Sequence, residues 1–140
     1  MPSEMRTGVD PDALMARARE CLDRTYAPYS RLQVAAAVID DRGRVFTGVN
    51  VENISYGLSM CAERVAIFTA IAAGARRITA LAVTCSGADL LSPCGACRQV
   101  IAEFAAPEVP IYCDAPGKAQ RWTVSELLPY GFAAAQLGKG

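Results

Sequence analysis

Three cysteines and one glutamate are spaced so that they could hold a metal ion and move a proton beside it. Cys61 stands two residues before Glu63, and Cys94 and Cys97 form a Cys-x-x-Cys pair directly after Pro93. Sulfur ligands favour zinc over magnesium or calcium. The chain contains no histidine, which excludes the common His-rich zinc and copper sites. Three protein ligands leave a tetrahedral zinc one open position, as is typical of catalytic sites.

Glu63 distinguishes a hydrolytic site from a structural one. A carboxylate beside the open position could accept a proton from an attacking water and deliver it to a substrate. Taken alone, Glu63 could equally do no more than favour the positive end of a helix dipole. However, Cys-x-Glu followed by Pro-Cys-x-x-Cys is the spacing of zinc deaminases with three cysteine ligands. The pattern therefore favours zinc-dependent hydrolytic deamination.

Short strands and helices must position these residues. We expect helices at residues 11–24, 60–73, 93–104 and 125–128, and strands at residues 34–39, 45–49, 78–84, 109–113 and 120–124. The turn at residues 40–43 ends in Gly43 and predicts a hairpin. Ser92 is expected to cap the helix of the Cys-x-x-Cys pair, with Pro93 in its first turn. This order of elements predicts an α/β fold with a mixed sheet covered by helices.

Composition limits the possible partners and compartment. The 140 residues are 52% hydrophobic and carry a formal net charge of zero, which suits a single domain over residues 1–140 with a small, uncharged partner. No signal peptide or stretch of about 20 apolar residues is present, so we expect no membrane partner and a cytoplasmic location. In that compartment the six cysteines indicate metal ligands or redox groups rather than disulfides.

Three ordered motifs carry a resemblance to a known family. They are Asn50-Val-Glu52-Asn53, Cys61-Ala-Glu63-Arg64 and Ser92-Pro-Cys94-Gly-Ala-Cys97-Arg98-Gln99. They resemble the small, homotetrameric cytidine deaminases, and the likeness runs from about Ala27 to Pro129. It implies a three-layer α/β/α sandwich with a mixed central sheet of about five strands. It also implies one Zn²⁺ per subunit and hydrolysis of cytidine and deoxycytidine to uridine and deoxyuridine in pyrimidine salvage.

The resemblance also implies a role for each matched residue. Cys61, Cys94 and Cys97 would ligate zinc, and Glu63 would carry protons to N3 of the base and then to the leaving amine. Arg64 and Arg98 would bond to the ligand sulfurs and withdraw some of their negative charge. Asn50 and Glu52 would bind the ribose 3′-hydroxyl of the substrate, and Leu32 and Ala62 would also contact the substrate. Tyr56 and Phe132 would contribute to sites shared between subunits. The ordinary alternatives are that Arg64 and Arg98 are exposed arginines on helix surfaces and that Phe132 is a core aromatic.

Leu32 departs from the family pattern, which has phenylalanine at the matching position, where the ring packs against the pyrimidine. Losing that ring removes a stacking contact and could open space near the base. We therefore expect a relaxed tolerance for substituted cytidines, including N4-substituted ones.

Four other functions remain open at the sequence level. A Cys-x-x-Cys pair at a helix start also occurs in thioredoxin-like redox proteins, but this leaves Cys61 and Glu63 unexplained. A structural zinc module would need a fourth ligand such as Cys85 or Cys113, both in expected strands. A blasticidin S deaminase has a similar zinc motif but departs from Asn50-x-Glu52-Asn53. A polynucleotide editor would need a basic groove, which the neutral composition disfavours.

Overall fold

Five strands form one mixed sheet in the order β2-β1-β3-β4-β5 in the computed structural model, which describes residues 9–138. The strands are β1 (Val34–Asp40), β2 (Val45–Val49), β3 (Ile78–Cys85), β4 (Pro110–Ala115) and β5 (Lys118–Thr123). Strands β3 and β4 run parallel, and the other neighbouring pairs run antiparallel. The α/β fold with a mixed sheet of about five strands is thus confirmed.

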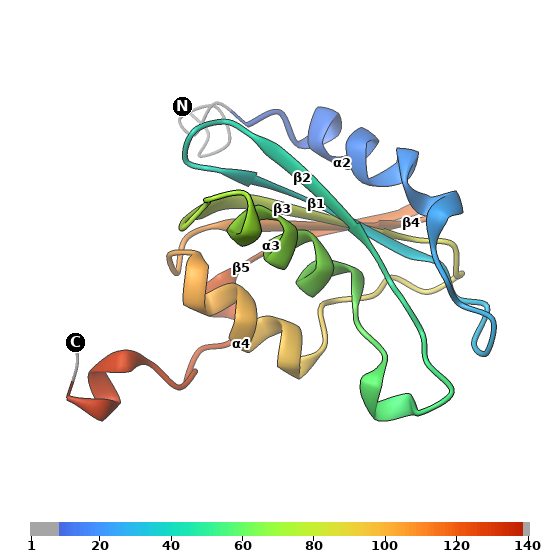
Figure 1. The fold of residues 1–140 in the computed structure, drawn as a ribbon. Helices are drawn as coiled ribbons and strands as arrows, with labels where there is room; N and C mark the ends of the chain where they lie inside the picture. The colour runs from blue at the N-terminus through green and yellow to red at the C-terminus, as the bar shows by residue number, and fades with distance from the viewer. Residues whose placement is uncertain (1–8, 139–140) are drawn as a thin grey trace.

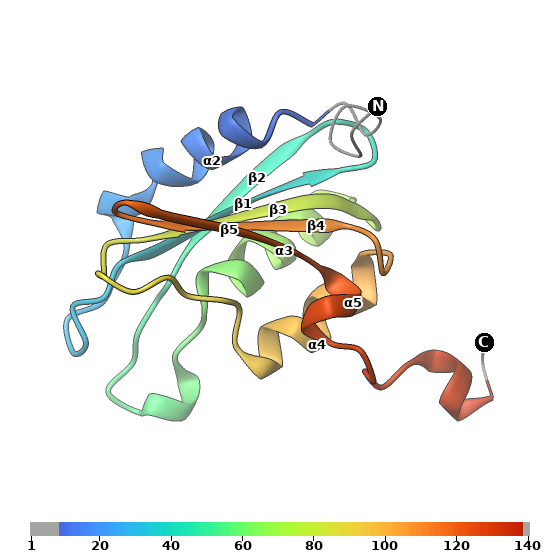
Figure 2. The same cartoon turned by 180° about the vertical axis from the view of Figure 1, so that it is seen from behind.

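Helices cover both faces of this sheet. Helix α2 (Pro11–Glu20) lies on one face, whereas α3 (Ala62–Ala72) and α4 (Gly95–Phe104) lie on the other, as Figures 1 and 2 show. The short helix α5 (Val124–Leu127) follows β5 and packs beside α4. The three layers are those of an α/β/α sandwich.

The side chains of the strands alternate between the two helical layers, as the two-residue period of a strand requires. In β3, Leu81 and Val83 join the core under α3 and α4, whereas Ala80 and Ala82 pack with α2. Because the residues facing α2 are mostly alanine, that helix can approach the sheet closely. The larger core lies on the other face, beneath the two helices whose first residues carry the cysteines.

Glycine at position 48 lets α3 approach the sheet. A Cβ atom on Gly48 would lie 2.3 Å from the backbone nitrogen of Ala66, so no other residue fits there without a shift. This contact fixes the height of α3 above β2 and therefore the position of Cys61, the residue before the helix.

The start of α4 differs from the expectation. The helix begins at Gly95 with Cys94 as its N-cap residue, so the prediction that Ser92 caps it and Pro93 lies in its first turn is wrong. Arg98 explains the difference, because its guanidinium donates hydrogen bonds to Ser92 Oγ at 2.8 Å and to Pro93 O at 2.7 Å. These bonds hold residues 92 and 93 outside the helix. The other predicted elements are present, with β2 at the expected residues and the ends of the rest shifted.

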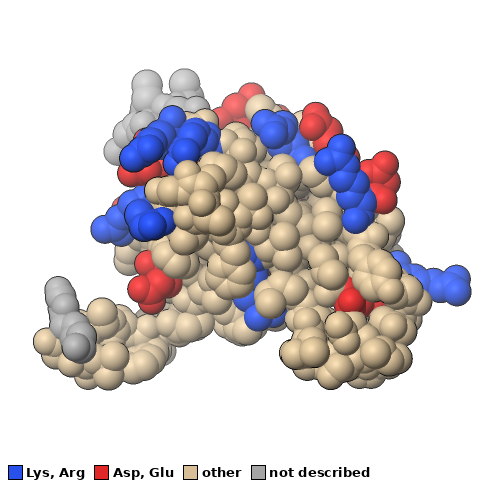
Figure 3. All heavy atoms as spheres, viewed as in Figure 1, with Lys and Arg blue, Asp and Glu red and all other residues tan. Residues whose placement is uncertain are grey.

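The surface in Figure 3 mixes both signs of charge. Basic and acidic side chains lie next to one another along the upper part of this face, and the described residues there form no continuous basic strip. Within residues 9–138, no helix is both long enough and apolar enough to span a membrane.

Candidate active site

The starts of α3 and α4 bring three cysteine sulfurs together. Cys61 is the N-cap residue of α3, Cys94 is the N-cap residue of α4, and Cys97 lies in the first turn of α4. Their sulfur atoms all lie within 4.8 Å of one another. Neither N-cap side chain bonds to its own helix backbone, so both sulfurs are available to a ligand.

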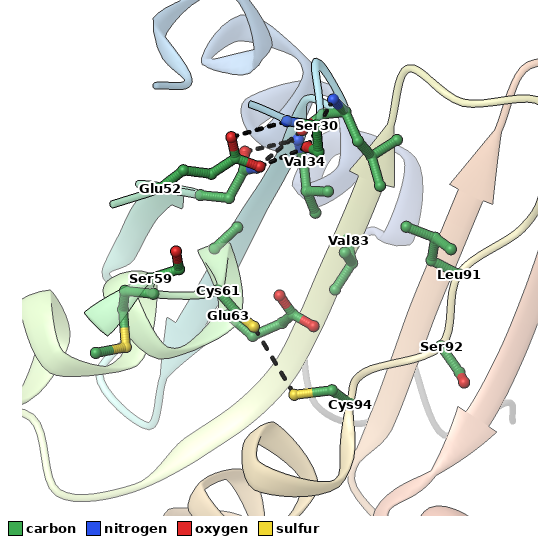
Figure 4. A pocket seen from close by; sticks show the side chains of 14 residues that line it. Ser30, Val34, Glu52, Ser59, Cys61, Glu63, Val83, Leu91, Ser92 and Cys94 are labelled. Carbon is green, nitrogen blue, oxygen red and sulfur yellow. Dashed lines mark hydrogen bonds between the residues drawn. The ribbon is translucent and has the colours of Figure 1, made fainter. Parts of the chain in front are cut away.

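The geometry of the cluster fits zinc. Two sulfurs that each lie about 2.3 Å from one tetrahedral zinc are about 3.8 Å apart. The Sγ atoms of Cys61 and Cys94 are 3.8 Å apart, and a dashed line joins them in Figure 4. Helix N-termini also stabilise negative charge through unpaired N–H groups and the helix dipole. The residues present therefore match a three-thiolate zinc site.

Arg64 lies against these sulfurs. Its Nη2 atom donates to Cys61 Sγ at 3.4 Å, and its charge also interacts with Cys97. A hydrogen bond from the Cys97 thiol, together with Arg64, lowers the pKa of Cys61 well below that of an ordinary thiol. The same hydrogen bond and burial raise the pKa of Cys97. Arg64 thus occupies the position at which a guanidinium balances the negative charge of thiolates.

Arg98 has different partners from Arg64. Besides its bonds to residues 92 and 93, it donates to Leu127 O at 3.0 Å from Nη1. Its hydrogen bonds with described residues all go to oxygen atoms rather than to sulfur. Arg98 therefore braces the loop that carries Cys94 against the end of α5, so it supports a ligand instead of contacting it.

Glu63 lies in the first turn of α3, beside Cys61 and inside a cavity. The residue is only 5% exposed, and its carboxylate points toward Val83, as Figure 4 shows. Burial, with a smaller effect from the charge of Cys61, raises the pKa of Glu63 to about 7. A carboxyl group with a pKa near neutrality is suited to accept and donate protons.

The cavity beside the cluster has a volume of about 370 Å³, within the range of small-molecule sites. The side chains of fourteen residues line it, namely Ser30, Leu32, Val34, Asn50, Glu52, Ser59, Met60, Cys61, Ala62, Glu63, Val83, Leu91, Ser92 and Cys94. Figure 4 shows its two polar ends, with Cys61, Cys94 and Glu63 at one and Ser30 and Glu52 at the other. Aliphatic side chains lie between them, so the cavity suits a molecule with a flat apolar middle and two polar ends.

The predicted substrate residues fall into two groups. Leu32, Asn50, Glu52 and Ala62 line the same cavity as Glu63. Tyr56 lies outside it, 75% exposed, with its ring 6.3 Å from that of Tyr29. Its position is on the loop that leads from β2 to α3.

Phe132 also lies outside the cavity of its own chain. It is 60% exposed on the C-terminal segment that projects from the body in Figures 1 and 2. The side-chain amide of Gln99 holds its backbone by donating to Phe132 O at 2.8 Å and accepting from Phe132 N at 3.3 Å. Neither Tyr56 nor Phe132 lines the main cavity of its own chain, although Tyr56 lines an adjoining pocket with Ser30 and Glu52.

Several cavity residues were not predicted from the sequence, among them Ser30, Met60, Val83 and Leu91. Ser30 carried a weak signal, because it lies near Ala27, where the resemblance to the family begins. The aliphatic residues carried none, since an apolar side chain in a strand or loop does not indicate whether it faces a core or a cavity.

Cys85 and Cys113 lie outside the sulfur cluster. Both are buried in strands, β3 and β4, and the only group of three or more potential metal ligands within residues 9–138 is Cys61, Cys94 and Cys97. Burial raises the pKa of the Cys113 thiol to about 12, which keeps it protonated. The arrangement thus lacks the fourth cysteine ligand of a structural zinc module.

Comparisons with known proteins agree with this chemistry. Residues 9–113 match the family described as the cytidine and deoxycytidylate deaminase zinc-binding region. A cytidine deaminase of Halalkalibacterium halodurans is 43% identical over 130 residues, which cover 92% of this chain and 98% of that protein. A cytidine deaminase of Sporosarcina psychrophila is 40% identical over 92% of this chain and 96% of its own. The crystal structure of cytidine deaminase from Burkholderia pseudomallei superimposes with a TM-score of 0.84 at 41% identity, covering 89% of this chain and all of that one.

Proposed function

Because this chain belongs to the cytidine and deoxycytidylate deaminase family, we propose that it hydrolyses cytidine and deoxycytidine to uridine and deoxyuridine with release of ammonia. One observation carries the proposal: three cysteine sulfurs and the buried carboxylate of Glu63 meet at one end of a cavity of nucleoside size. The products place the enzyme in pyrimidine salvage.

We propose that Cys61, Cys94 and Cys97 hold one Zn²⁺ per chain. When bound, zinc acts as a Lewis acid that makes water a better nucleophile at neutral pH. Arg64 offsets the charge of the three thiolates from one side, and Arg98 fixes the loop that carries Cys94. Three protein ligands would leave a tetrahedral zinc one open position.

Glu63 supplies the proton transfers. Its carboxylate accepts a proton from the attacking water and delivers it to N3 of the cytosine ring as the C4–O bond forms. Glu63 then accepts the remaining proton of the new hydroxyl group and delivers it to the amine nitrogen. The C4–N4 bond breaks, ammonia leaves and the C4 carbonyl of uridine forms, so that Glu63 ends ionised as it began.

The opposite end of the cavity suits the sugar. Asn50 uses Oδ1 to accept from Val34 N and one Nδ2 proton to donate to Leu32 O, which leaves a second N–H for a substrate oxygen. Glu52 can accept from a hydroxyl, and we assign the pair to the ribose 3′-hydroxyl. A carboxylate at this place repels a phosphate, so we propose free nucleosides as substrates rather than nucleotides.

We also propose the assembly and the location of the enzyme. Residues 1–140 form a single domain, and four copies form a homotetramer in which Tyr56 and Phe132 of each chain contribute to neighbouring sites. Both side chains are exposed and neither lines the main cavity of its own chain, which supports this arrangement. The enzyme acts in the cytoplasm, without a membrane or polynucleotide partner.

The test is an ultraviolet assay of cytidine conversion by the purified, zinc-replete protein beside its Glu63→Ala variant. We expect conversion to uridine by the wild type and a loss of at least about 10²-fold in kcat for the variant, because general acid–base catalysis contributes about 10²–10⁴-fold. Glu20→Ala, which changes an exposed glutamate at the end of α2, serves as the control and should retain activity. A wild type that binds zinc but does not convert cytidine would contradict the proposal.

A further inference from the structure

The turn over the sugar end of the cavity has an unfavourable backbone conformation. Arg31 has a φ of 61°, in the left-handed region that non-glycine residues rarely adopt. Its N–H donates to Ala27 O at 2.9 Å, which closes the turn. The residues on either side of it, Ser30 and Leu32, both line the cavity. Such a conformation persists only where neighbouring groups hold it in place.

The carboxylate of Glu52 holds this turn. Its Oε1 atom accepts two backbone N–H groups, from Tyr29 at 2.9 Å and from Ser30 at 3.1 Å. Its Oε2 atom accepts the hydroxyl proton of Ser30. The same hydroxyl oxygen accepts the N–H of Leu32 at 3.1 Å, so Ser30 connects the turn to the next cavity residue.

These contacts leave Glu52 with little freedom. An ionised carboxylate has about four acceptor positions, two on each oxygen. The two N–H groups occupy both positions of Oε1, and the Ser30 hydroxyl occupies one of the two on Oε2. One acceptor position remains, and Glu52 lines the cavity. The Ser30 hydroxyl is also the main cause of a lowered pKa of Glu52, which keeps the carboxylate ionised as an acceptor.

We propose that Ser30 is a positioning residue for substrate binding: its hydroxyl fixes Glu52 so that the last acceptor position of the carboxylate meets one sugar hydroxyl. The inference rests on the proposed function, and it adds a residue that determines which hydroxyl the enzyme requires. Ser30 acts through Glu52 and takes no part in proton transfer at the base. It should therefore affect the binding of the sugar and leave the chemical step unchanged.

The test compares Ser30→Ala with Ser30→Thr, which keeps the hydroxyl, on cytidine and on 3′-deoxycytidine. For Ser30→Ala we expect a rise of about tenfold in KM for cytidine, the effect of one lost charged hydrogen bond, with kcat within about twofold of wild type. On 3′-deoxycytidine, which lacks the hydroxyl, the same variant should match the wild type. Ser30→Thr should restore the KM for cytidine. Ser30 is exposed, so we expect its truncation to leave the core intact. Thermal melting of the variant checks that it folds.

A double variant tests whether Ser30 acts through Glu52. In a Glu52→Gln background, Ser30→Ala should add less than about twofold to the KM for cytidine, since both changes disrupt the same contact. An equal loss on cytidine and 3′-deoxycytidine, an unchanged KM for Ser30→Ala, or additive effects of the two changes would overturn the inference. A wild type without activity on cytidine would instead overturn the proposed function, so the two failures are distinguishable.

Discussion

At the scale of single residues, Leu32 is a cavity residue at which the sequence departs from the expected family pattern. It lines the cavity together with Val83 and Leu91, so this part of the cavity wall is aliphatic and not aromatic. Leucine side chains change rotamers and lack the flat face that would stack on a pyrimidine. We therefore propose that this position limits the size of the substituent that the base can carry.

We expect Leu32→Phe to narrow the range of substrates. A ring at this position adds stacking on cytidine and removes space for an N4-acyl group, and changes of this kind in a pocket are worth about 10–200-fold in discrimination. The ratio of kcat/KM for N4-acetylcytidine to that for cytidine should fall about tenfold relative to wild type. Leu22→Phe, at a half-buried leucine outside the cavity, is the matched control. An unchanged ratio would mean that Leu32 does not determine this specificity.

The gathering of the three cysteines beside Glu63 could be predicted from the sequence because it depends on local spacing. Cys61 and Glu63 are two positions apart, and Cys94 and Cys97 are three apart, so one helical turn places each pair. The contacts of Ser30 could not be found in this way. Its partner Glu52 lies 22 positions away, and only the closing of the turn beside β1 brings the two together.

At the scale of secondary structure elements, the candidate metal site lies where the starts of two helices meet. The starts of α3 and α4 come together at Cys61, Cys94 and Cys97. A bound ion therefore connects elements that are separated in the chain by β3 and its flanking loops. Its removal should loosen the helical layer on that face of the sheet.

We expect zinc removal to lower the melting temperature by about 10 °C. A ligand present at about 1,000 times its Kd stabilises the folded state by about 4 kcal/mol, and each kcal/mol shifts the melting temperature of a chain of this size by about 2–4 °C. Differential scanning fluorimetry before and after chelation measures the shift, and elemental analysis should give one zinc per chain. Zinc, but not magnesium, should restore the original value. Equal melting temperatures with and without zinc would contradict the site.

The turn between β1 and β2 depends on one buried carboxylate. Asp40 is 2% exposed and accepts hydrogen bonds from Arg42 N at 3.0 Å, Arg44 N at 2.8 Å and Arg44 Nε at 2.8 Å. Burial alone would raise the pKa of Asp40, but the bonds from Arg44 and Arg42 outweigh it and lower the pKa. A lowered pKa in the folded state means that the ionised carboxylate stabilises the fold above about pH 4.

We expect Asp40→Asn to reduce the free energy of unfolding at pH 7 by about 1–3 kcal/mol, the cost of losing a buried, charge-assisted hydrogen-bond network. The stabilisation by Asp40 is lost as the pH falls below about 4 and passes the lowered pKa, so the wild type and the variant should converge there. Urea denaturation at several pH values measures both effects. Asp41→Asn, at an exposed position of the same turn, should change stability little. A difference between Asp40→Asn and wild type that grows toward low pH would contradict this role.

The helix boundaries show where propensity alone is insufficient. A serine followed by proline is a common helix start, so the sequence favoured Ser92 as the cap of α4. In the structure, Arg98 binds the oxygen atoms of Ser92 and Pro93 and Cys94 becomes the N-cap residue. This contact spans five or six positions and depends on the helix already being formed, so no local pattern could show it.

At the scale of the whole molecule, the positions of the strands along the sequence were predictable, but their order in the sheet was not. The hairpin of β1 and β2 follows from the turn at Gly43, whose φ is 80°. The placement of β3 between β1 and β4 requires pairing between distant segments. This order positions the starts of α3 and α4 at the same edge of the sheet, which gathers the three cysteines into one site.

Two projections of the chain carry exposed apolar residues, and the last prediction concerns them. Ile54, Tyr56 and Leu58 are 73%, 75% and 68% exposed on the loop before α3, and Phe132 is 60% exposed on the C-terminal segment. Apolar side chains grouped in this way mark contact surfaces.

We expect multi-angle light scattering of the wild type to give the mass of four chains. Ile54→Asp with Leu58→Asp should reduce that mass and, because Tyr56 lies between them, raise the KM for cytidine. Glu20→Ala should leave the mass unchanged. A fully active monomeric wild type would show that each cavity is complete within one chain, and the roles assigned to Tyr56 and Phe132 would then be wrong.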